Sequence, residues 1–474
     1  MKKTQIWAWY ISTFFKKHKR LMVAGILLGI LISVCFIWLL PIIPRPVKTN
    51  RIGLIGQYNK NQLPLTIRNK VSQGLTATME DGSVAPLLAE KWDVSDNGQE
   101  YTFYLRDNLY WQDGTALTTK DLEYNFSDLD IEKKDDETIL FRLTSGKSFA
   151  PFPVLLTTPI FKKNLIGTGD YVIKQVKENG GIVKSVNIEK NDEKIIYKIY
   201  PTLSMAKMAF LMGEIDVIQN ISTNPFEYET EWQQTTDIIS KQENNIHIGL
   251  FFNLENDLFK DNKALRQALA YATRKPKDES RATGPIARTS WAYNLDVKIY
   301  DFEPKRANEL AEKSLGNIEK VRAMQLKIST TNSLLSLAEE IKRDWEEVFG
   351  CNVEIEVINT IQPDYQILLT AQEIPEDPDQ YALWHSTQSW PGNIINLKNL
   401  RIDKLLEDGR TEIDTKVRKD YYFEFQKYFV EEVPVLFLYY PNYYTIVRKN
   451  TVKNVLIDIL QKGRRMSQSV ETTE

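Results

Sequence analysis

Two short segments of the chain carry residue types that serine acyl-transfer enzymes use. Ser204-Met205-Ala206-Lys207 has the S-x-x-K spacing, in which a lysine can activate a nucleophilic serine, and Ser95-Asp96-Asn97 has the S-D-N pattern. The order of the two motifs is reversed here, and neither a K-T-G nor a K-S-G triplet occurs. Asp and Asn before Gly98 are also ordinary turn residues. We therefore expect no catalytic residues, and serine acyl transfer is the weakest functional hypothesis.

The sequence also offers little material for a metal or cofactor site. It contains no G-x-x-x-x-G-K-[ST], G-x-G-x-x-G, H-E-x-x-H or G-x-S-x-G segment. His247 and His385 lie far apart, and each lacks a neighbouring His or Cys. The acidic stretch Glu373–Asp379 contains two prolines, which disrupt an EF-hand-like calcium loop. We expect no bound metal and no cofactor, and Asp377-Pro378 fits the start of a helix.

Residues 21–40 form a run of twenty residues without a charge, which directly follows the basic cluster Lys16–Arg20. An α-helix of this length crosses about 30 Å of hydrocarbon, and the positive-inside rule keeps its basic end in the cytoplasm. We predict a cytoplasmic N-terminus (1–20), a transmembrane anchor (21–40), a proline-rich tether (41–50) and an extracytoplasmic body. The alternative is a cleaved signal peptide and a secreted or periplasmic protein. The length of the run and the lack of a small-x-small cleavage site favour the anchor.

The charges of the chain are unevenly distributed. The 474 residues include 60 Lys+Arg and 63 Asp+Glu, but residues 1–40 contain six basic residues and no acidic one. The chain after residue 40 therefore has a net negative charge. This argues against nucleic acid as a partner, because phosphate binding needs a basic face. The length predicts more than one hydrophobic core, and a hydrophobic content of 42% excludes a disordered chain.

Hydrophobic patterns predict a mixed α/β body after the tether. Alternating residues predict strands over 100–105 and 138–143, and Asn97-Gly98 predicts a hairpin turn before the first of them. Apolar residues at helical spacing predict helices over 334–348 and 417–429. The remaining patterns indicate strands over 353–357 and 435–440 and a helix that begins within 119–126. Such alternation of helices and strands is typical of the α/β class.

Several blocks of sequence occur in a characteristic order. Residues 86–126 contain P-x-L-A-x-x-W, Y-T-F-x-L-R, W-x-D-G and D-x-x-Y-x-F. Further blocks are I-G-T-G-D-Y (166–171), G-E-I-D (213–216), R-Q-A-L-A-Y-A (266–272) and D-P-D-Q-Y (377–381). Over about residues 51–460 the chain resembles the family 5 extracellular solute-binding proteins, the peptide- and nickel-binding components of ABC importers.

This resemblance implies a periplasmic-binding-protein-like type II clamp with three lobes. Lobe I would combine residues 51–74, 160–248 and 433–462, lobe II would occupy 75–159, and lobe III 249–432. Two strand-like segments, Ile246–Leu254 and Val433–Thr445, would cross between lobes I and III as hinges. Residues 463–474 would form a flexible tail.

The resemblance also implies where a ligand lies. Peptide-binding relatives pair the ligand's α-amino group with an Asp four residues before the proline of the D-P element, a position that Ile374 occupies here. Because isoleucine cannot make a charge-assisted hydrogen bond, we expect Glu373 or Glu376 to replace it, or a ligand without a free amino terminus. The other expected ligand-binding residues are Tyr381, Trp384, His385 and Trp390 after the D-P-D element, and Tyr58 and Leu63 in lobe I. For the aromatic side chains, interior packing is the alternative.

Together these features predict an extracytoplasmic substrate-binding protein of an ABC transporter. It would capture a peptide or other small solute by hinge closure and deliver it to permease subunits in the membrane. We expect a monomer without enzymatic activity. A membrane-anchored sensor or adhesin that uses the same clamp without transport is the second hypothesis.

Overall fold

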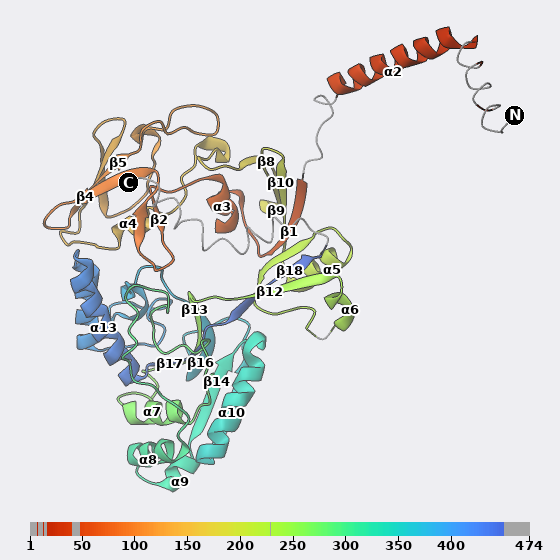
Figure 1. The fold of residues 1–474 in the computed structure, drawn as a ribbon. Helices are drawn as coiled ribbons and strands as arrows, with labels where there is room; N and C mark the ends of the chain where they lie inside the picture. Colours follow the sequence, from red (N-terminus) through yellow and green to blue (C-terminus); the bar gives the residue numbers. More distant parts are fainter. Residues whose placement is uncertain (1–6, 8–12, 14–16, 40–47, 228, 450–474) are drawn as a thin grey trace. The chain divides into compact units, whose positions relative to one another are not determined.

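A computed structural model describes residues 7, 13, 17–39, 48–227 and 229–449 (Figure 1). The chain divides into two compact units, residues 1–49 with 191–194 and the remainder. The first unit contains helix α2 (Lys19–Leu39). None of the helices in the described part of the chain meets the length and hydrophobicity of a membrane span, so the anchor predicted at 21–40 is not supported by the structure. The predictions for 41–47, 450–462 and 463–474 fall outside the described residues.

Lobe I is built on a seven-stranded sheet in the order β12-β18-β11-β1-β10-β9-β8. β1 (Lys48–Ile55) is parallel to β11 (Val217–Ile221), and β18 (Asn442–Arg448) is antiparallel to both β11 and β12 (Thr236–Gln242). The other strands and helices of this lobe are β8 (Val172–Asn179), β9 (Ile182–Lys190), β10 (Glu193–Tyr200), α3 (Leu65–Val71), α5 (Leu203–Leu211) and α6 (Thr230–Gln233). Alternate residues of β9 and β10, including Val186 and Tyr197, fill the core.

Lobe II contains a four-stranded antiparallel sheet in the order β4-β5-β7-β6. Its elements are β2 (Thr76–Thr78), β3 (Val84–Pro86), β4 (Ala89–Val94), β5 (Glu100–Leu105), β6 (Leu129–Lys133), β7 (Thr138–Leu143) and α4 (Phe152–Leu155). The strands predicted at 100–105 and 138–143 are confirmed, and the Asn97-Gly98 hairpin joins β4 to β5. The helix predicted to begin within 119–126 is wrong. A capping box between Thr118 and Asp121 closes one 3₁₀ turn, Thr119–Asp121, and the chain is extended again at Leu122.

Lobe III is a five-stranded sheet between two layers of helices. The strand order is β15-β14-β16-β13-β17, with β13 (Ile246–Phe252), β14 (Gln325–Thr330), β15 (Asn352–Val357), β16 (Ile367–Glu373) and β17 (Val435–Tyr439). Successive residues of β13 face opposite cores, Leu250 toward the layer of α7, α8 and α10 and Phe251 toward the layer of α11, α12 and α13. The helices are α7 (Lys263–Tyr271), α8 (Pro304–Leu315), α9 (Ile318–Arg322), α10 (Leu335–Phe349), α11 (Tyr381–Trp384), α12 (Leu400–Thr411) and α13 (Thr415–Glu432).

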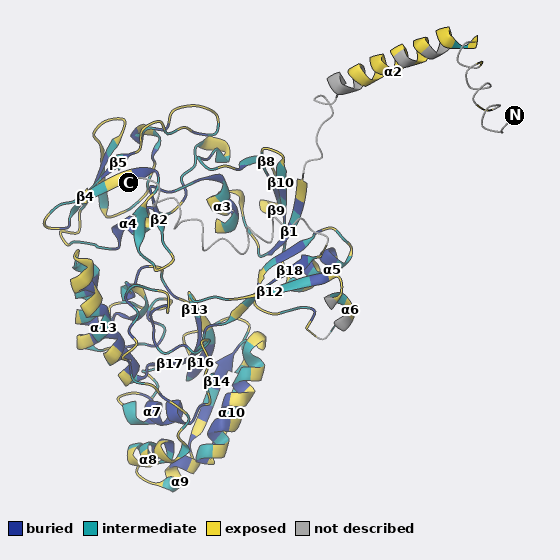
Figure 2. Cartoon of the chain, viewed as in Figure 1, coloured by how far each residue is buried: buried dark blue, intermediate teal, exposed yellow. Residues whose placement is uncertain are grey.

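The helices and strand predicted for this lobe are confirmed. α10 covers most of 334–348, α13 covers 417–429 and β15 covers 353–357. Figure 2 shows the alternation of buried and exposed residues on α10, whose buried side carries Ile341 and Trp345. A glycine in the left-handed conformation, Gly350, ends this helix at φ 65°.

Two short segments cross between the sheets of lobes I and III. Residues 243–245 connect β12 to β13, and residues 440–441 connect β17 to β18. The two crossings lie side by side, because the amide of Glu243 donates to the carbonyl oxygen of Pro441 at 2.9 Å. β17 pairs with β13 of the five-stranded sheet, whereas β18 pairs with β11 and β12 of the seven-stranded sheet.

The Gln112 side chain of lobe II makes several of the hydrogen bonds that join lobes I and II. Nε2 of Gln112 lies within 2.9 Å of the carbonyl oxygens of Val71, Gly169 and Tyr171, and the amide of Gly167 donates to its Oε1 at 3.1 Å. A side chain at Gly167 would collide with the carbonyl oxygen of Val71. The I-G-T-G segment therefore needs glycine for this close approach.

Candidate ligand-binding site

The D-P-D segment after β16 is held by a buried ion pair. Arg418 of α13 donates to both carboxylate oxygens of Asp377 at 2.8 and 2.6 Å, and its Nε donates to the carbonyl oxygen of Gly409 at 2.7 Å. Burial opposes the charge of Arg418, but the hydrogen bonds and the charge of Asp377 outweigh it and raise the pKa of the guanidinium. The pair therefore stays ionised and fixes the segment against α13.

Arg410, near the end of α12, lies between aromatic rings of two lobes. Its guanidinium carbon is 4.5 Å from the ring centre of Tyr381 in lobe III and 4.8 Å from that of Phe149 in lobe II. Nε lies 3.2 Å from Oδ2 of Asp379, the second aspartate of the D-P-D segment. Burial raises the pKa of Asp379, and the positive charge of Arg410 acts against that increase. Two rings and one carboxylate thus define the position of this guanidinium.

Hydrogen bonds join lobe II to lobe III beside the D-P-D segment. One of them involves Glu376, a predicted ligand-binding residue, whose carboxylate accepts from a lobe II hydroxyl. Two others are main-chain bonds, which do not depend on side-chain identity. The pairs, with the donor first, are Thr78 Oγ1 with Glu376 Oε2 (2.5 Å), Trp291 N with Asp81 O (2.8 Å), Ala150 N with Arg410 O (3.0 Å) and Ser148 Oγ with Thr411 O.

Two hollows lie along the contact between lobes II and III. The larger has a volume of about 400 Å³ and is lined by residues of lobe II and by Tyr381, Glu407, Arg410 and Thr411 of lobe III. The smaller has a volume of about 230 Å³, and Trp92, Tyr101, Trp291 and Arg418 are among its lining residues. Pockets for small ligands usually measure roughly 300–1,000 Å³. The larger hollow therefore suits a small ligand or one side chain of a longer ligand.

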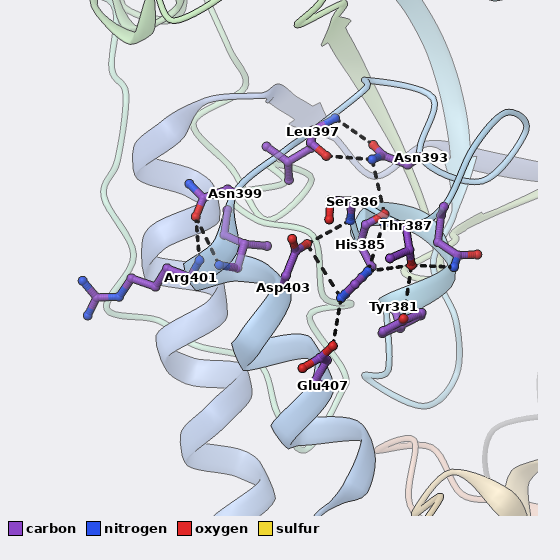
Figure 3. A network of polar contacts seen from close by, with 12 residues as sticks. Tyr381, His385, Ser386, Thr387, Asn393, Leu397, Asn399, Arg401, Asp403 and Glu407 are labelled. Atoms are coloured by element: carbon purple, nitrogen blue, oxygen red, sulfur yellow. Dashed lines mark hydrogen bonds and ion pairs between the residues drawn. The ribbon is translucent and has the colours of Figure 1, made fainter. Parts of the chain in front are cut away.

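His385 lies in a polar network behind Tyr381 (Figure 3). Its buried imidazole stacks on the Tyr381 ring with the ring centres 4.0 Å apart, and Nδ1 is 2.8 Å from the Thr387 hydroxyl. Nε2 lies 3.5 Å from Glu407 and 3.9 Å from Asp403, both on α12. His385 therefore contacts two residues that line the larger hollow, Tyr381 and Glu407, and does not line it itself.

Two of the predicted residues pack in hydrophobic cores. Trp384 is fully buried near Phe251 and Phe429, and its indole N–H donates to Oε1 of Gln380 at 2.6 Å. Leu63 is buried in the core of lobe I. Interior packing accounts for both side chains in this structure. Ile374, which stands where relatives have the aspartate, is also buried in a core of lobe III.

The other predicted residues are more exposed. Glu373 ends β16 and is exposed, and Trp390 is 37% exposed. Tyr58 is half-buried, and its hydroxyl donates to the carbonyl oxygen of Ile55 at 3.3 Å. Within the described residues, none of these three lines either hollow. Their contact with a ligand stays a prediction.

Sequence spacing does not point to several residues of the larger hollow. Arg410 lies 261 positions after Phe149, and only the folding of lobe II onto lobe III brings them together. The one local signal is the position of Arg410 in the last turn of α12, where a cation interacts favourably with the helix dipole. That signal indicates a helix end and not a binding residue.

The residues of the S-x-x-K and S-D-N motifs make local structural contacts. Nζ of Lys207 donates to Oε1 of Glu229 at 2.6 Å and to the carbonyl oxygen of Pro225 at 2.9 Å, so it is engaged away from Ser204. The Ser95 hydroxyl donates to Oδ1 of Asn97 at 2.7 Å within the hairpin turn. Among the described residues, no three His, Cys, Asp or Glu side chains are grouped so as to hold a metal ion.

The architecture of the sheets and the ordered motifs are those of a known family. Residues 83–393 match the family model of bacterial extracellular solute-binding proteins, family 5 (Middle). The chain belongs to this family. The predicted α/β, periplasmic-binding-protein-like fold and the predicted role as substrate-binding protein for ABC transport are thereby confirmed. Members act outside the cytoplasm and are not enzymes.

Curated relatives of this family 5 protein include binders of different solutes. The oligopeptide-binding protein AppA of Bacillus subtilis is 24% identical over 84% of this chain and 87% of its own length. The dipeptide-binding protein of Escherichia coli is 23% identical, covering 87% of this chain and 90% of its own. The nickel-binding periplasmic protein of Escherichia coli is 26% identical over 54% of this chain and 57% of its own.

Solved structures share the fold of most of the chain. CtaP of Listeria monocytogenes, an ABC transporter substrate-binding protein, superimposes with a TM-score of 0.71 at 24% identity, covering 85% of this chain and 94% of its own. AppA of Bacillus subtilis in complex with a nonapeptide superimposes with a TM-score of 0.64 at 21% identity, covering 86% of this chain and 96% of its own.

Proposed function

We propose that this solute-binding protein captures a peptide-like solute by rotation of lobe III against lobes I and II, and delivers it to ABC permease subunits. The observation that carries the proposal is the pair of crossings at 243–245 and 440–441, which are short and adjacent. Gln112 joins lobes I and II, so these two lobes move as one body. The hydrogen bonds between lobes II and III then stabilise the closed form, in which lobe III lies against lobe II.

A peptide-like cargo is supported by the chemistry of the larger hollow. Phenylalanine and leucine side chains form most of its lobe II wall, and charged groups from both lobes lie around them. Such a lining favours an amphipathic organic ligand over a bare metal ion. Among the named relatives, two bind oligopeptides or dipeptides. Glu373 is exposed and remains the candidate partner for a ligand amino group, since Glu376 already accepts from Thr78.

Residues 1–40 support transfer of the following chain across the membrane. An uncharged run after a basic cluster acts either as a retained anchor or as a cleaved leader, and both place the body outside the cytoplasm. N-terminal sequencing of the mature protein and membrane fractionation distinguish the two. An intact N-terminus in the membrane fraction supports the anchor, and a start after residue 40 in the soluble fraction supports the leader.

The test of cargo is a binding screen with the purified protein. Thermal unfolding would be followed with di- to nonapeptides, amino acids, nickel–histidine and sugars. A saturable increase in Tm with peptides, followed by calorimetry of the best binder, supports the proposal. Stabilisation by sugars or by nickel–histidine alone, with no response to any peptide, would overturn the peptide-like cargo.

A further inference from the structure

The larger hollow between lobes II and III combines an apolar floor with balanced charges. Its floor is formed by Phe126, Leu129, Leu143, Phe149, Phe152 and Leu155 of lobe II. Four charged residues line it as well, two cations and two carboxylates: Lys147, Arg410, Asp128 and Glu407. A hollow with no net charge and both signs present suits a zwitterion that carries a large apolar group.

Arg410 has donors that a carboxylate ligand could use. The Tyr381 and Phe149 rings lie over its guanidinium, and its Nε faces Asp379 at 3.2 Å. Its two terminal amino groups have no hydrogen-bond partner among the described residues. A planar fork of N–H donors held in this way binds a carboxylate with two parallel hydrogen bonds.

Other arginines in lobe III show what a fully engaged guanidinium looks like. Arg418 donates hydrogen bonds to Asp377, Gly409 and Tyr422. Arg266 donates to the main-chain carbonyl oxygens of Phe259, Glu432 and Val433, and it lies 3.6 Å from the Glu432 carboxylate. Both are buried, and their donors are occupied by protein acceptors, whereas Arg410 lines the 400 Å³ hollow with two amino groups that have no such acceptor in the described part of the chain.

We propose that this hollow binds an apolar residue that ends in a free carboxylate, with its side chain on the phenylalanine and leucine floor and its carboxylate on Arg410. The residue is the C-terminal residue of a short peptide or a free amino acid. Lys147 is the second cation for the carboxylate, and Asp128 or Glu407 receives an amino group in the free amino acid. The inference rests on the proposed function and names the part of the cargo that this subsite selects.

Calorimetry with four probes tests the subsite: Ala-Phe, Ala-Phe with a C-terminal amide, Ala-Ala and free phenylalanine. We expect Ala-Phe to bind more tightly than its amide and than Ala-Ala. Arg410→Gln should weaken the binding of Ala-Phe by about 10- to 100-fold, because charge-assisted hydrogen bonds are lost. It should also abolish the preference for the carboxylate over the amide. Comparison of Ala-Phe with phenylalanine shows whether the carboxylate comes from a peptide or an amino acid.

The matched control is Arg401→Gln, on the same helix. Arg401 also lies over an aromatic ring, that of Tyr428, but it does not line the hollow. This variant should leave affinity and carboxylate preference unchanged. Because Arg410→Gln removes the cation beside Asp379, its melting temperature is compared with that of the control before binding is interpreted.

A second variant tests the floor without touching Arg410. Leu155 is 41% exposed and lines the hollow, so Leu155→Gln should fold normally and reduce the preference for Ala-Phe over Ala-Ala. The inference is overturned if folded Arg410→Gln keeps the carboxylate preference, or if Leu155→Gln leaves the side-chain preference intact, while peptides still bind; the proposed function then stands. Failure of every peptide and amino acid to bind overturns both.

Discussion

Asp377 and Arg418, 41 residues apart, face each other through two parallel hydrogen bonds of 2.6 and 2.8 Å inside lobe III. One residue opens the D-P-D segment and the other lies near the start of α13. Both side chains are removed from solvent, so each charge depends on the other for its stabilisation. This pair connects a sequence motif to the helix that supports it.

Removing one member of this pair should destabilise the fold severely. Arg418→Leu leaves the buried Asp377 carboxylate without its ion-pair partner, which costs about 3–5 kcal/mol in the free energy of unfolding. Urea denaturation at neutral pH measures this cost. Arg401→Leu, which removes an exposed arginine from α12, is the control and should cost less than about 1 kcal/mol. Equal losses for the two variants would contradict the assignment.

Gly82 should be needed for the contact between lobes II and III. It has φ +78°, and a Cβ there would lie 2.8 Å from the carbonyl oxygen of Glu376. Gly114 has φ +80° with nothing within 4 Å of its Cβ position, so it shares the backbone conformation without the contact. Ala at either position costs about 1 kcal/mol from the positive φ.

Only Gly82→Ala should also loosen the lobe contact. The amide of Trp291 donates to the carbonyl oxygen of Asp81, next to Gly82, and reports on the contact through its hydrogen-exchange rate. We expect faster exchange at Trp291 in Gly82→Ala and an unchanged rate in Gly114→Ala. Unchanged exchange in both variants would show that the contact tolerates a side chain.

His247 should make the protein less stable in acid. It is 1% exposed in β13, near the rings of Phe251 and Phe437, and burial lowers its pKa to about 3. An unfolded histidine has a pKa of about 6.5. Between these values the unfolded chain binds a proton that the folded chain does not, so stability falls as pH falls below about 6.5.

The corresponding variant is His247→Phe, compared with the unchanged protein at pH 7 and pH 5. Between pH 7 and pH 5 the unchanged protein should lose about 2 kcal/mol more in its free energy of unfolding than the variant does. The variant lacks this loss because it has no histidine at this position that binds a proton only when unfolded. Chemical denaturation at both pH values gives the difference, and subtraction cancels the other titrating groups. A pH-independent difference would show that His247 does not titrate between the two states in this range.

Arg266 should stabilise the end of α13 through carbonyl groups. Its side chain is 4% exposed and donates to Phe259, Glu432 and Val433, and burial lowers its pKa only to about 10, so it stays charged at neutral pH. Arg266→Met removes the charged donors from these carbonyl oxygens and should cost about 3 kcal/mol or more. Lys263→Met, on the same helix but with surface ion pairs to Glu431 and Glu432, should cost less than about 1 kcal/mol. Urea denaturation of both variants is the measurement.

The elements of this fold follow from local pattern where one face is buried. Alternation around Phe103 and Phe141 predicts the strands of lobe II, and the stripe through Ile341 and Trp345 predicts α10. The pattern fails at residues 119–126, because the Thr118–Asp121 capping box suits a single turn as well as a longer helix. Whether the chain continues as a helix there depends on Tyr124 and Phe126, which pack into the aromatic core of lobe II.

The residues of the site are harder to predict from the sequence than the strands and helices are. Tyr381 follows directly from the D-P-D motif, but Phe149 and Arg410 meet only when lobes II and III come together. Trp384 and His385 share the composition of a ligand-binding segment, yet burial against Phe429 and stacking on Tyr381 determine where they lie. Residue type indicates chemistry at such positions, whereas tertiary packing determines which side chains reach the hollow.

The adjacent crossings at 243–245 and 440–441 have a consequence for signalling across the membrane. If lobe III rotates as proposed, two adjacent links bonded to each other would define one rotation axis and resist sliding or twisting. The angle between the lobes would then be a single variable, and every surface patch on lobe III would travel along one arc. A permease that touches a patch on each side of that axis would register occupancy as a spacing, without contacting the cargo.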